Sequence, residues 1–239
     1  MGKDKGQQME FISVGENIHT TRVLRRKGKS VVENEGLESI TYIGPENEAR
    51  FLVIPEVFKE RQEYRQGQIK HVMIAVNTAM SDNEHSAEAM TYLAILASKQ
   101  VEAEATYLDV NVDEISWKLE DQKAAMRWLV ETLQQVTKSP LSIDSSNADV
   151  IEEGLAAYNH DTSRPLLNSA SLERLDALDL ALEYNASVVV TAAGARGMPD
   201  GVEGRVENAS KMVENALSKG FNLKDIFIDP LVFPASVDK

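Results

Sequence analysis

The sequence predicts an α/β fold built on a parallel sheet, in the form of a (β/α)8 barrel. Two observations lead to this expectation. Short apolar segments rich in Val and Ile alternate with amphipathic helical segments, and after the first unit the strands recur at intervals of roughly 20–40 residues. Strands that are apolar throughout are typical of parallel sheets covered by helices on their faces. A doubly wound open sheet is the alternative arrangement.

Hydrophobic patterning places six strands and five helices along the chain. The strands are expected at 11–15, 107–112, 141–144, 165–168, 187–191 and 226–229. The helices are expected near 84–102, 120–137, 148–157, 172–182 and 203–219. The clearest helix is 120–137, because its apolar residues repeat at the i, i+3, i+4, i+7 spacing of one helix face.

The segment 20–70 interrupts this alternation. It begins with a basic cluster between Arg22 and Lys29, and it continues with two strand-like runs, 40–44 and 50–55, separated by Pro45, Glu46 and Asn47. We expect these runs to form a β-hairpin. We interpret the segment as an insertion between the first strand and its helix, on the face where barrel enzymes place their sites.

The strand count bears on completeness. An eight-stranded barrel needs two more strand–helix units after the sixth strand, whereas the sequence stops at Lys239. We therefore expect a barrel that is incomplete at its C-terminal side, unless the chain is a fragment, another component completes it, or the sheet is open. Residues 1–8 are interpreted as a polar leader or tag, and residues 9–239 as one domain.

Composition excludes several classes of function. The chain has no cysteine, which rules out disulfides, thiolate metal sites and cysteine nucleophiles. Its four histidines include no i, i+4 pair, so we expect no protein-bound metal. A net charge of −13 disfavours nucleic acids and anionic membranes. No run of ~18 apolar residues and no secretory signal is found, so the protein is expected to be cytoplasmic.

Small polar residues stand near the carboxyl end of the predicted strands. They are Glu16 and Asn17, Asp109 and Asn111, Asp144 and Ser145, Asn168 and Ser169, Thr191, and Asp229. In a parallel barrel all these ends surround one mouth, so carboxylates and amides are expected to converge there. Each position also has a purely structural interpretation. Ser146 with Asp149 could cap the following helix, and Asp229 before Pro230 could belong to a turn.

A site of carboxylates and amides without Lys, Arg or His suits a neutral heterocycle that is rich in N–H donors. An amino-pyrimidinone presents an exocyclic amine beside a ring N–H, and one carboxylate can accept both hydrogen bonds as a fork. A second carboxylate and an amide can bind the remaining ring nitrogens.

Several blocks of the sequence resemble the pterin-binding methyltransferases, in particular those that act between methyltetrahydrofolate and a corrinoid/iron–sulfur protein. Dihydropteroate synthase shares the fold of this superfamily. The resemblance covers about 85–235 together with 11–17. The blocks that carry it are Gly15-Glu16-Asn17, Asp109-Val110-Asn111, 122–131, Ser142 to Asn147 with 151–155, Leu167-Asn168-Ser169 and Ile228-Asp229 to Pro234.

The resemblance implies a barrel that holds the pterin of methyltetrahydrofolate in its mouth. By motif match, Asp144, Asn168 and Asp229 would contact the pterin ring, with Asn111 nearby and Asn17 on the first strand. In that family the N5-methyl group passes by direct displacement to the cobalt(I) of a corrinoid (cobalamin) carried by a partner protein, and the enzyme holds no metal. No catalytic residue is assigned, because a further pterin-side Asn of the family stands on a seventh strand.

Two departures from the family pattern leave alternatives open. The insertion at 20–70 is absent from the compact methyltransferases, and we expect it to rim the mouth and to influence the choice of partner. Dihydropteroate synthase is a second interpretation, although its Asn-x-Thr-Pro-Asp-Ser-Phe loop is replaced here by Asn17-Ile18-His19-Thr20-Thr21. A non-catalytic pterin-binding subunit is the third. The oligomeric state, a homodimer or another, is left open.

Overall fold

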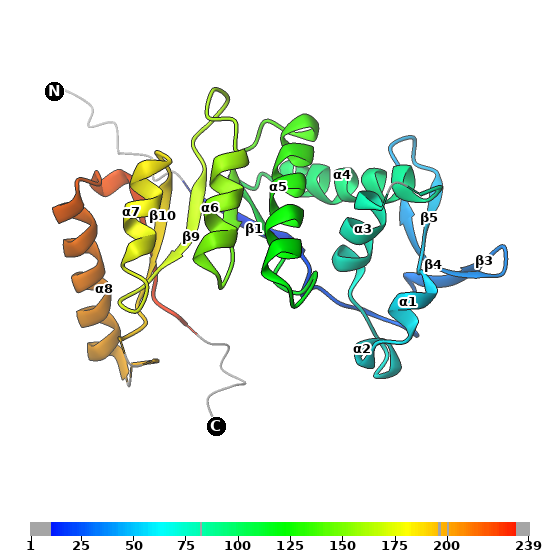
Figure 1. Ribbon diagram of the computed structural model, residues 1–239, viewed down its shortest axis with the longest axis horizontal. Coiled ribbons are helices and arrows are strands. Elements are labelled where there is room, and N and C mark those ends of the chain that lie inside the picture. Colours follow the sequence, from blue (N-terminus) through cyan, green and yellow to red (C-terminus); the bar gives the residue numbers. More distant parts are fainter. Residues whose placement is uncertain (1–10, 82, 196, 200, 233–239) are drawn as a thin grey trace, which may run out of the picture.

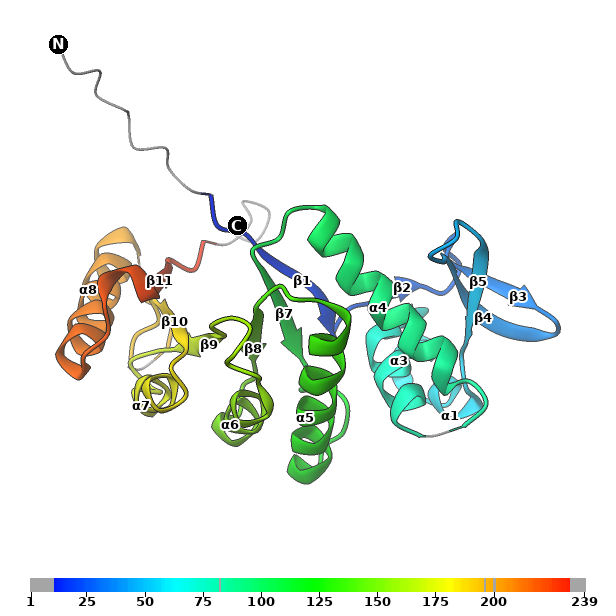
Figure 2. The same cartoon turned by 90° about the horizontal axis from the view of Figure 1, so that it is seen from above.

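A six-stranded parallel sheet forms the centre of the computed structural model, which describes residues 11–81, 83–195, 197–199 and 201–232. The strands lie side by side in the order β1-β7-β8-β9-β10-β11 (Figures 1 and 2). Their bounds are β1 Val14–His19, β7 Tyr107–Asn111, β8 Leu141–Asp144, β9 Leu166–Ala170, β10 Ser187–Thr191 and β11 Ile226–Asp229. The predicted α/β class and parallel sheet are therefore confirmed.

The sheet is strongly curved. The rings of Tyr107 on β7 and Phe227 on β11 meet edge to face with their centroids 6.1 Å apart, although three strands lie between them. In a flat sheet four strand spacings would separate them by roughly 19 Å. The strands thus bend into a barrel-like arc that is open between β1 and β11, with these rings on its concave face.

Helices cover the convex face of the arc (Figure 2). They are α3 His71–Met80, α4 Ser86–Glu102, α5 Leu119–Val136, α6 Ala148–Ala157, α7 Asp176–Glu183 and α8 Gly201–Lys219, and the 3-10 turn Leu223–Asp225 precedes β11. Leu108 and Val110 point into this layer and are completely buried, whereas their neighbours Asp109 and Asn111 point the other way. The alternation along β7 puts apolar side chains against the helices and polar ones on the concave face.

The insertion forms two small antiparallel sheets at the β1 end of the molecule (Figure 1). One joins β3 Val31–Asn34, β4 Leu37–Ile43 and β5 Ala49–Val53, and the other joins β2 Leu24–Arg25 to β6 Gln68–Ile69. Two short helices, α1 Glu56–Lys59 and α2 Gln62–Arg65, lie between them in sequence. The predicted insertion and its hairpin are confirmed.

Polar contacts attach the insertion to the barrel-like part. Glu88 on α4 accepts hydrogen bonds from Tyr42 (2.5 Å) and from Nε of Arg50 (3.1 and 3.2 Å). Lys70 pairs with Glu63 at 2.9 Å and with Glu114, in the loop after β7, at 2.6 Å. The insertion is therefore held against α4 and against a loop at the carboxyl end of the sheet.

Outside the insertion, three elements differ most from expectation. The first strand begins at Val14 rather than residue 11 and continues to His19, so Glu16 and Asn17 lie within it. Helix α7 begins at Asp176 because Arg174 closes a turn onto Ser171. Helix α3 was not predicted, because His71 to Val76 is buried along its whole length and such a run has no amphipathic period.

None of the helices in the described ranges is both long enough and apolar enough to cross a bilayer.

Candidate functional site

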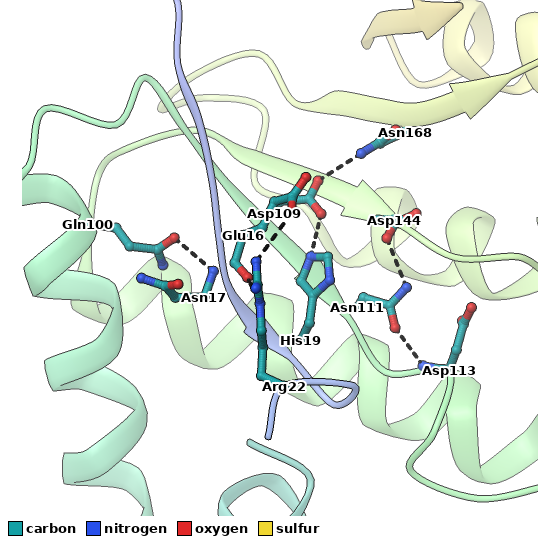
Figure 3. Close-up of polar contacts among 10 residues, drawn as sticks. All are labelled: Glu16, Asn17, His19, Arg22, Gln100, Asp109, Asn111, Asp113, Asp144 and Asn168. Carbon is teal, nitrogen blue, oxygen red and sulfur yellow. Dashed lines mark hydrogen bonds and ion pairs between the residues drawn. The ribbon is translucent and has the colours of Figure 1, made fainter. Parts of the chain in front are cut away.

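Four polar side chains form a row across the carboxyl ends of β1, β7, β8 and β9. The strand register pairs His19 with Asn111, Asn111 with Asp144, and Asp144 with Asn168. Register partners in parallel strands point to the same face of a sheet. These four residues, called here the strand-end row, therefore share the concave face, as Figure 3 shows.

Asp109 precedes Asn111 by two residues on β7 and makes hydrogen bonds to two members of the strand-end row. Its Oδ2 accepts a hydrogen bond from Nε2 of His19 at 2.5 Å, and its Oδ1 accepts one from the amide of Asn168 at 3.2 Å (Figure 3). The Asp109 side chain is 0% exposed and that of His19 is 12% exposed. A carboxylate this deeply buried needs such partners, and both of its oxygens have one.

Asn111 is oriented by the loop that follows β7. Its Oδ1 accepts the backbone N–H of Asp113 at 3.0 Å, which leaves its amide to donate to Oδ2 of Asp144 at 2.9 Å. The carboxylate of Asp113 accepts the hydroxyl of Ser145 at 2.5 Å and the backbone N–H of Ser146 at 2.9 Å. The loops after β7 and β8 are thus locked together beside the strand-end row.

Negative charge accumulates in this site. Burial, followed by the charges of Asp109 and Asp113, raises the pKa of Asp144 to about 6, although Asn111 and His19 act in the opposite direction. Burial alone would lower the pKa of His19, but the hydrogen bond and charge of Asp109 outweigh it, and the pKa is raised above 6.5. The site therefore favours a ligand that offers hydrogen-bond donors to carboxylates.

His19, Asp109 and Asp144 also have the spacing of a metal site, since their ligand atoms lie within 4.8 Å of one another. Within the described ranges no other group of three His, Asp or Glu residues meets this criterion. Both oxygens of Asp109 are already engaged by His19 and Asn168, so hydrogen bonds hold the cluster together without an ion. The atoms left for a ligand are Nδ1 of His19 and Oδ1 of Asp144.

The five residues predicted from the sequence do not all meet. Asn111, Asp144 and Asn168 belong to the strand-end row. Asp229 ends β11 two residues after Phe227 and so lies on the same concave face. Its Oδ1 also accepts the N–H of Leu231 at 2.8 Å, so the turn interpretation holds as well.

Asn17 lies apart from the other four. Its backbone N–H donates to Oε1 of Gln100 on α4 at 3.1 Å, and its side chain lies on the opposite side of β1 from His19 (Figure 3). The ladder between β1 and β7 shifts register between Gly15 and Ile18. Regular alternation from Val14, the partner of Tyr107, would turn Ile18 inward, but the bulge turns Ile18 to the helix side with Val110 and His19 inward beside Asn111.

The expectation of a site without histidine is therefore wrong, since His19 occupies the β1 position of the strand-end row. The sequence signal for His19 is weak, because one bulge decides whether Ile18 or His19 faces inward. The predicted Ser146 cap is also replaced. The N-cap of α6 is Asn147, whose side chain accepts the N–H of Asp149 at 2.9 Å. Asp144 is free of this capping role.

A protein family and several known proteins are similar to part of this chain. The model of the family described as "Pterin binding enzyme" matches residues 76–239. A curated relative, the methylcorrinoid:tetrahydrofolate methyltransferase of Eubacterium limosum, is 30% identical over 148 residues. That alignment covers 59% of this chain and 52% of the relative, so the chain spans about half the length of that relative.

Solved structures of dihydropteroate synthases are similar to part of the chain. A Yersinia pestis enzyme, solved with a pterine–sulfa conjugate, gives a TM-score of 0.46 at 22% identity, covering 60% of this chain and 54% of its own. The 7,8-dihydropteroate synthase of Vibrio fischeri gives 0.45 at 20% identity, covering 58% and 56%.

Proposed function

Because the chain belongs to the pterin-binding enzyme family, we propose that it transfers a methyl group between methyltetrahydrofolate and the cobalt of a corrinoid carried by a partner protein. The observation that carries the proposal is the strand-end row with Asp109 beneath it. It gathers carboxylate and amide groups on one concave face, and the family is described as binding a pterin.

The acceptors of the site complement the pyrimidine edge of a pterin. Its 2-amino group and ring N3–H lie side by side, and a single carboxylate accepts both as a fork. Asp144 supports this assignment because one of its oxygens accepts from Asn111 and the other has no protein donor among the described residues. Asn168 and Asp229 extend the same face and would bind the remaining ring atoms.

The choice of methyl transfer follows from the chemistry of the site together with the curated relative. The chain has no cysteine, and the strand-end row holds no lysine or serine nucleophile, so direct displacement by an external nucleophile is favoured over a covalent enzyme intermediate. The relative is named for methyl transfer between a methylcorrinoid and tetrahydrofolate. Either direction of the reaction is compatible with this site.

In this proposal the protein acts mainly by positioning. Asp144, Asn168 and Asp229 would hold the pterin flat on the concave face, so that N5 meets the cobalt of the partner at the carboxyl ends of the strands. The insertion contacts the loop after β7 through Lys70 and Glu114. This contact supports the proposal that the insertion would meet the corrinoid protein as that protein approaches.

The test is to mix the protein with methyltetrahydrofolate and chemically reduced cobalamin. Methylcobalamin should form, and its visible absorption spectrum reports the reaction. The reverse reaction, from methylcobalamin and tetrahydrofolate, should also proceed. Both assays should lose most of their rate in Asp144→Ala but not in Asp149→Asn, a replacement in the first turn of α6 outside the strand-end row.

Two other results would replace this proposal. Formation of pteroate from aminobenzoate and a pterin pyrophosphate with magnesium, without cobalt methylation, would indicate a dihydropteroate synthase. Pterin binding without either activity would indicate a non-catalytic pterin-binding subunit.

A further inference from the structure

The imidazole of His19 is held at one nitrogen and open at the other. Nε2 lies 2.5 Å from Oδ2 of Asp109, and an ionised carboxylate can only accept, so Nε2 is the donor. Among the described residues no protein atom makes a hydrogen bond to Nδ1. Asp109 thereby fixes the ring orientation and leaves Nδ1 for another partner.

A partner of Nδ1 would lie on the concave face that carries the strand-end row. His19 is the register partner of Asn111, and Asn111 donates to Asp144 at 2.9 Å. The imidazole thus lies in the same row as the side chains that would bind the pterin (Figure 3). With a side-chain exposure of 12% it is largely shielded from water, yet it can still be reached from the concave face.

The proposed reaction moves a proton as well as a methyl group. When cobalt(I) attacks the N5-methyl carbon, its electron pair forms the Co–C bond and the electrons of the C–N bond stay on N5. An amine anion is a very poor leaving group, so N5 must take up a proton as the bond breaks. In the reverse direction N5 attacks the methyl carbon, the electrons of the Co–C bond return to cobalt, and N5 must release a proton.

We propose that His19 is a catalytic residue of this methyl transfer, whose Nδ1 contacts the pterin and exchanges that proton with N5, while Asp109 is its positioning residue. The proposal rests on the proposed function. The ring donates from Nδ1 in the direction of cobalt methylation and becomes neutral. In the direction of tetrahydrofolate methylation the neutral ring accepts the proton and becomes charged.

The surrounding charges favour this role. Asp109 on β7, Asp144 on β8 and Glu16 on β1 all stabilise the protonated ring and raise its pKa above 6.5 against the effect of burial. The nearest cation on the same segment, Arg22, is paired with Glu16 at 3.2 Å. On the other side of β1, α4 contributes the neutral Gln100. These charges therefore favour the protonated ring that would donate from Nδ1.

The first experiment separates binding from the chemical step. His19→Gln should lower kcat by roughly 10²–10⁴-fold in both directions, the usual contribution of a proton-transferring group. The dissociation constant for methyltetrahydrofolate, measured by calorimetry, should change by much less. Free imidazole should restore part of the rate to His19→Ala. His85→Gln, in the turn before α4, is the matched control and should leave kcat unchanged.

The pH profile is the sharper test. At saturating substrate, kcat for cobalt methylation should fall as pH rises through the pKa of His19, and kcat for tetrahydrofolate methylation should rise through the same pKa. His19→Gln should remove both limbs. Asp109→Asn removes the charge that raises the pKa of His19, so both limbs should move to lower pH. A structural histidine would give parallel profiles that do not respond to Asp109.

A binding readout keeps this proposal separate from the proposed function. The ring resonances of His19 in nuclear magnetic resonance spectra should shift when methyltetrahydrofolate is added. If they shift but wild-type protein transfers no methyl group, the proposed function fails while the contact with the pterin stands, and the proton transfer is refuted. If transfer occurs, and His19→Gln keeps a normal kcat and both pH limbs, the role of His19 is overturned while the proposed function stands.

Discussion

The strand-end row and the insertion both contain partly buried carboxylates, but they treat the charge in opposite ways. In the insertion and at its contact with α4, such groups pair with a cation. Burial would raise the pKa of Glu88 on α4, yet Arg50 and Tyr42 of the insertion lower it. The pKa of Glu38, within the insertion, is lowered in the same way by Tyr64 and Arg26. At the row, burial and then the charges of Asp109 and Asp113 raise the pKa of Asp144 to about 6. The paired carboxylates Glu38 and Glu88 stabilise the fold. The carboxylate of Asp144, whose charge the protein does not fully offset, indicates a binding site for a ligand.

The largest expected effect is on ligand affinity. Asp144→Ala and Asp229→Ala should each weaken methyltetrahydrofolate binding by about 2–4 kcal/mol, because each leaves buried donors of the pterin without an acceptor. That corresponds to roughly 30- to 900-fold in the dissociation constant. Isothermal titration calorimetry measures it, and unchanged affinity in both variants would remove these residues from the binding site.

The next largest effect is a gain in stability, in contrast to the loss of affinity expected for the alanine variants. Asp144→Asn should raise the free energy of unfolding at pH 7 by about 1–3 kcal/mol, since it removes a charge that folding makes costly. It keeps an oxygen that can accept from Asn111. Urea unfolding followed by circular dichroism measures the change. A less stable variant would mean that Asp144 is a structural residue like Glu88.

The pH dependence of the free energy of unfolding tests the raised pKa of Asp144 independently. A raised pKa means that the folded state binds the Asp144 proton more tightly than the unfolded state. Its contribution to stability is therefore fully present below about pH 4 and is lost as pH rises through about 6. The wild-type protein should lose stability relative to Asp144→Asn across this window, and parallel curves would contradict the raised pKa.

A smaller effect is expected where the insertion contacts Glu88 on α4. Glu88→Gln weakens the contacts with Tyr42 and Arg50, whose ion pair is only partly buried, with side chains 33% and 23% exposed. It should cost about 1–2 kcal/mol of stability and leave methyltetrahydrofolate affinity unchanged. The same unfolding and calorimetric measurements apply. A large loss of affinity would show that the insertion shapes the binding site directly.

The smallest effect is expected at Asp149, which stands in the first turn of α6 near the strand-end row. Asp149→Asn removes a favourable charge from the helix N-terminus and should cost about 0.5 kcal/mol of stability. It should not alter ligand affinity. A loss of affinity comparable with that of Asp144→Ala would show that negative charge near the row, rather than the specific acceptor, controls binding.

Much of this arrangement could be predicted from the sequence, because it depends on strand ends. Asn111, Asp144 and Asn168 each end or nearly end an apolar run, and parallel strands bring such positions to one edge of the sheet. His19 could not be predicted in this way, because the bulge before Ile18 decides which residue of β1 faces inward. Helix α3 and the contacts of Glu88 depend on tertiary packing that leaves no periodic signal.

The most direct test of the contrast is the titration of the Asp144 carboxyl carbon by nuclear magnetic resonance, with and without methyltetrahydrofolate. Without ligand, Asp144 should titrate near pH 6, far above its ordinary value of 3.8. With ligand bound, the N–H donors of the pterin should stabilise the ionised carboxylate and move the titration to lower pH. An ordinary pKa in the free protein, or a titration that the ligand does not move, would contradict the assignment of the strand-end row as an uncompensated pterin site.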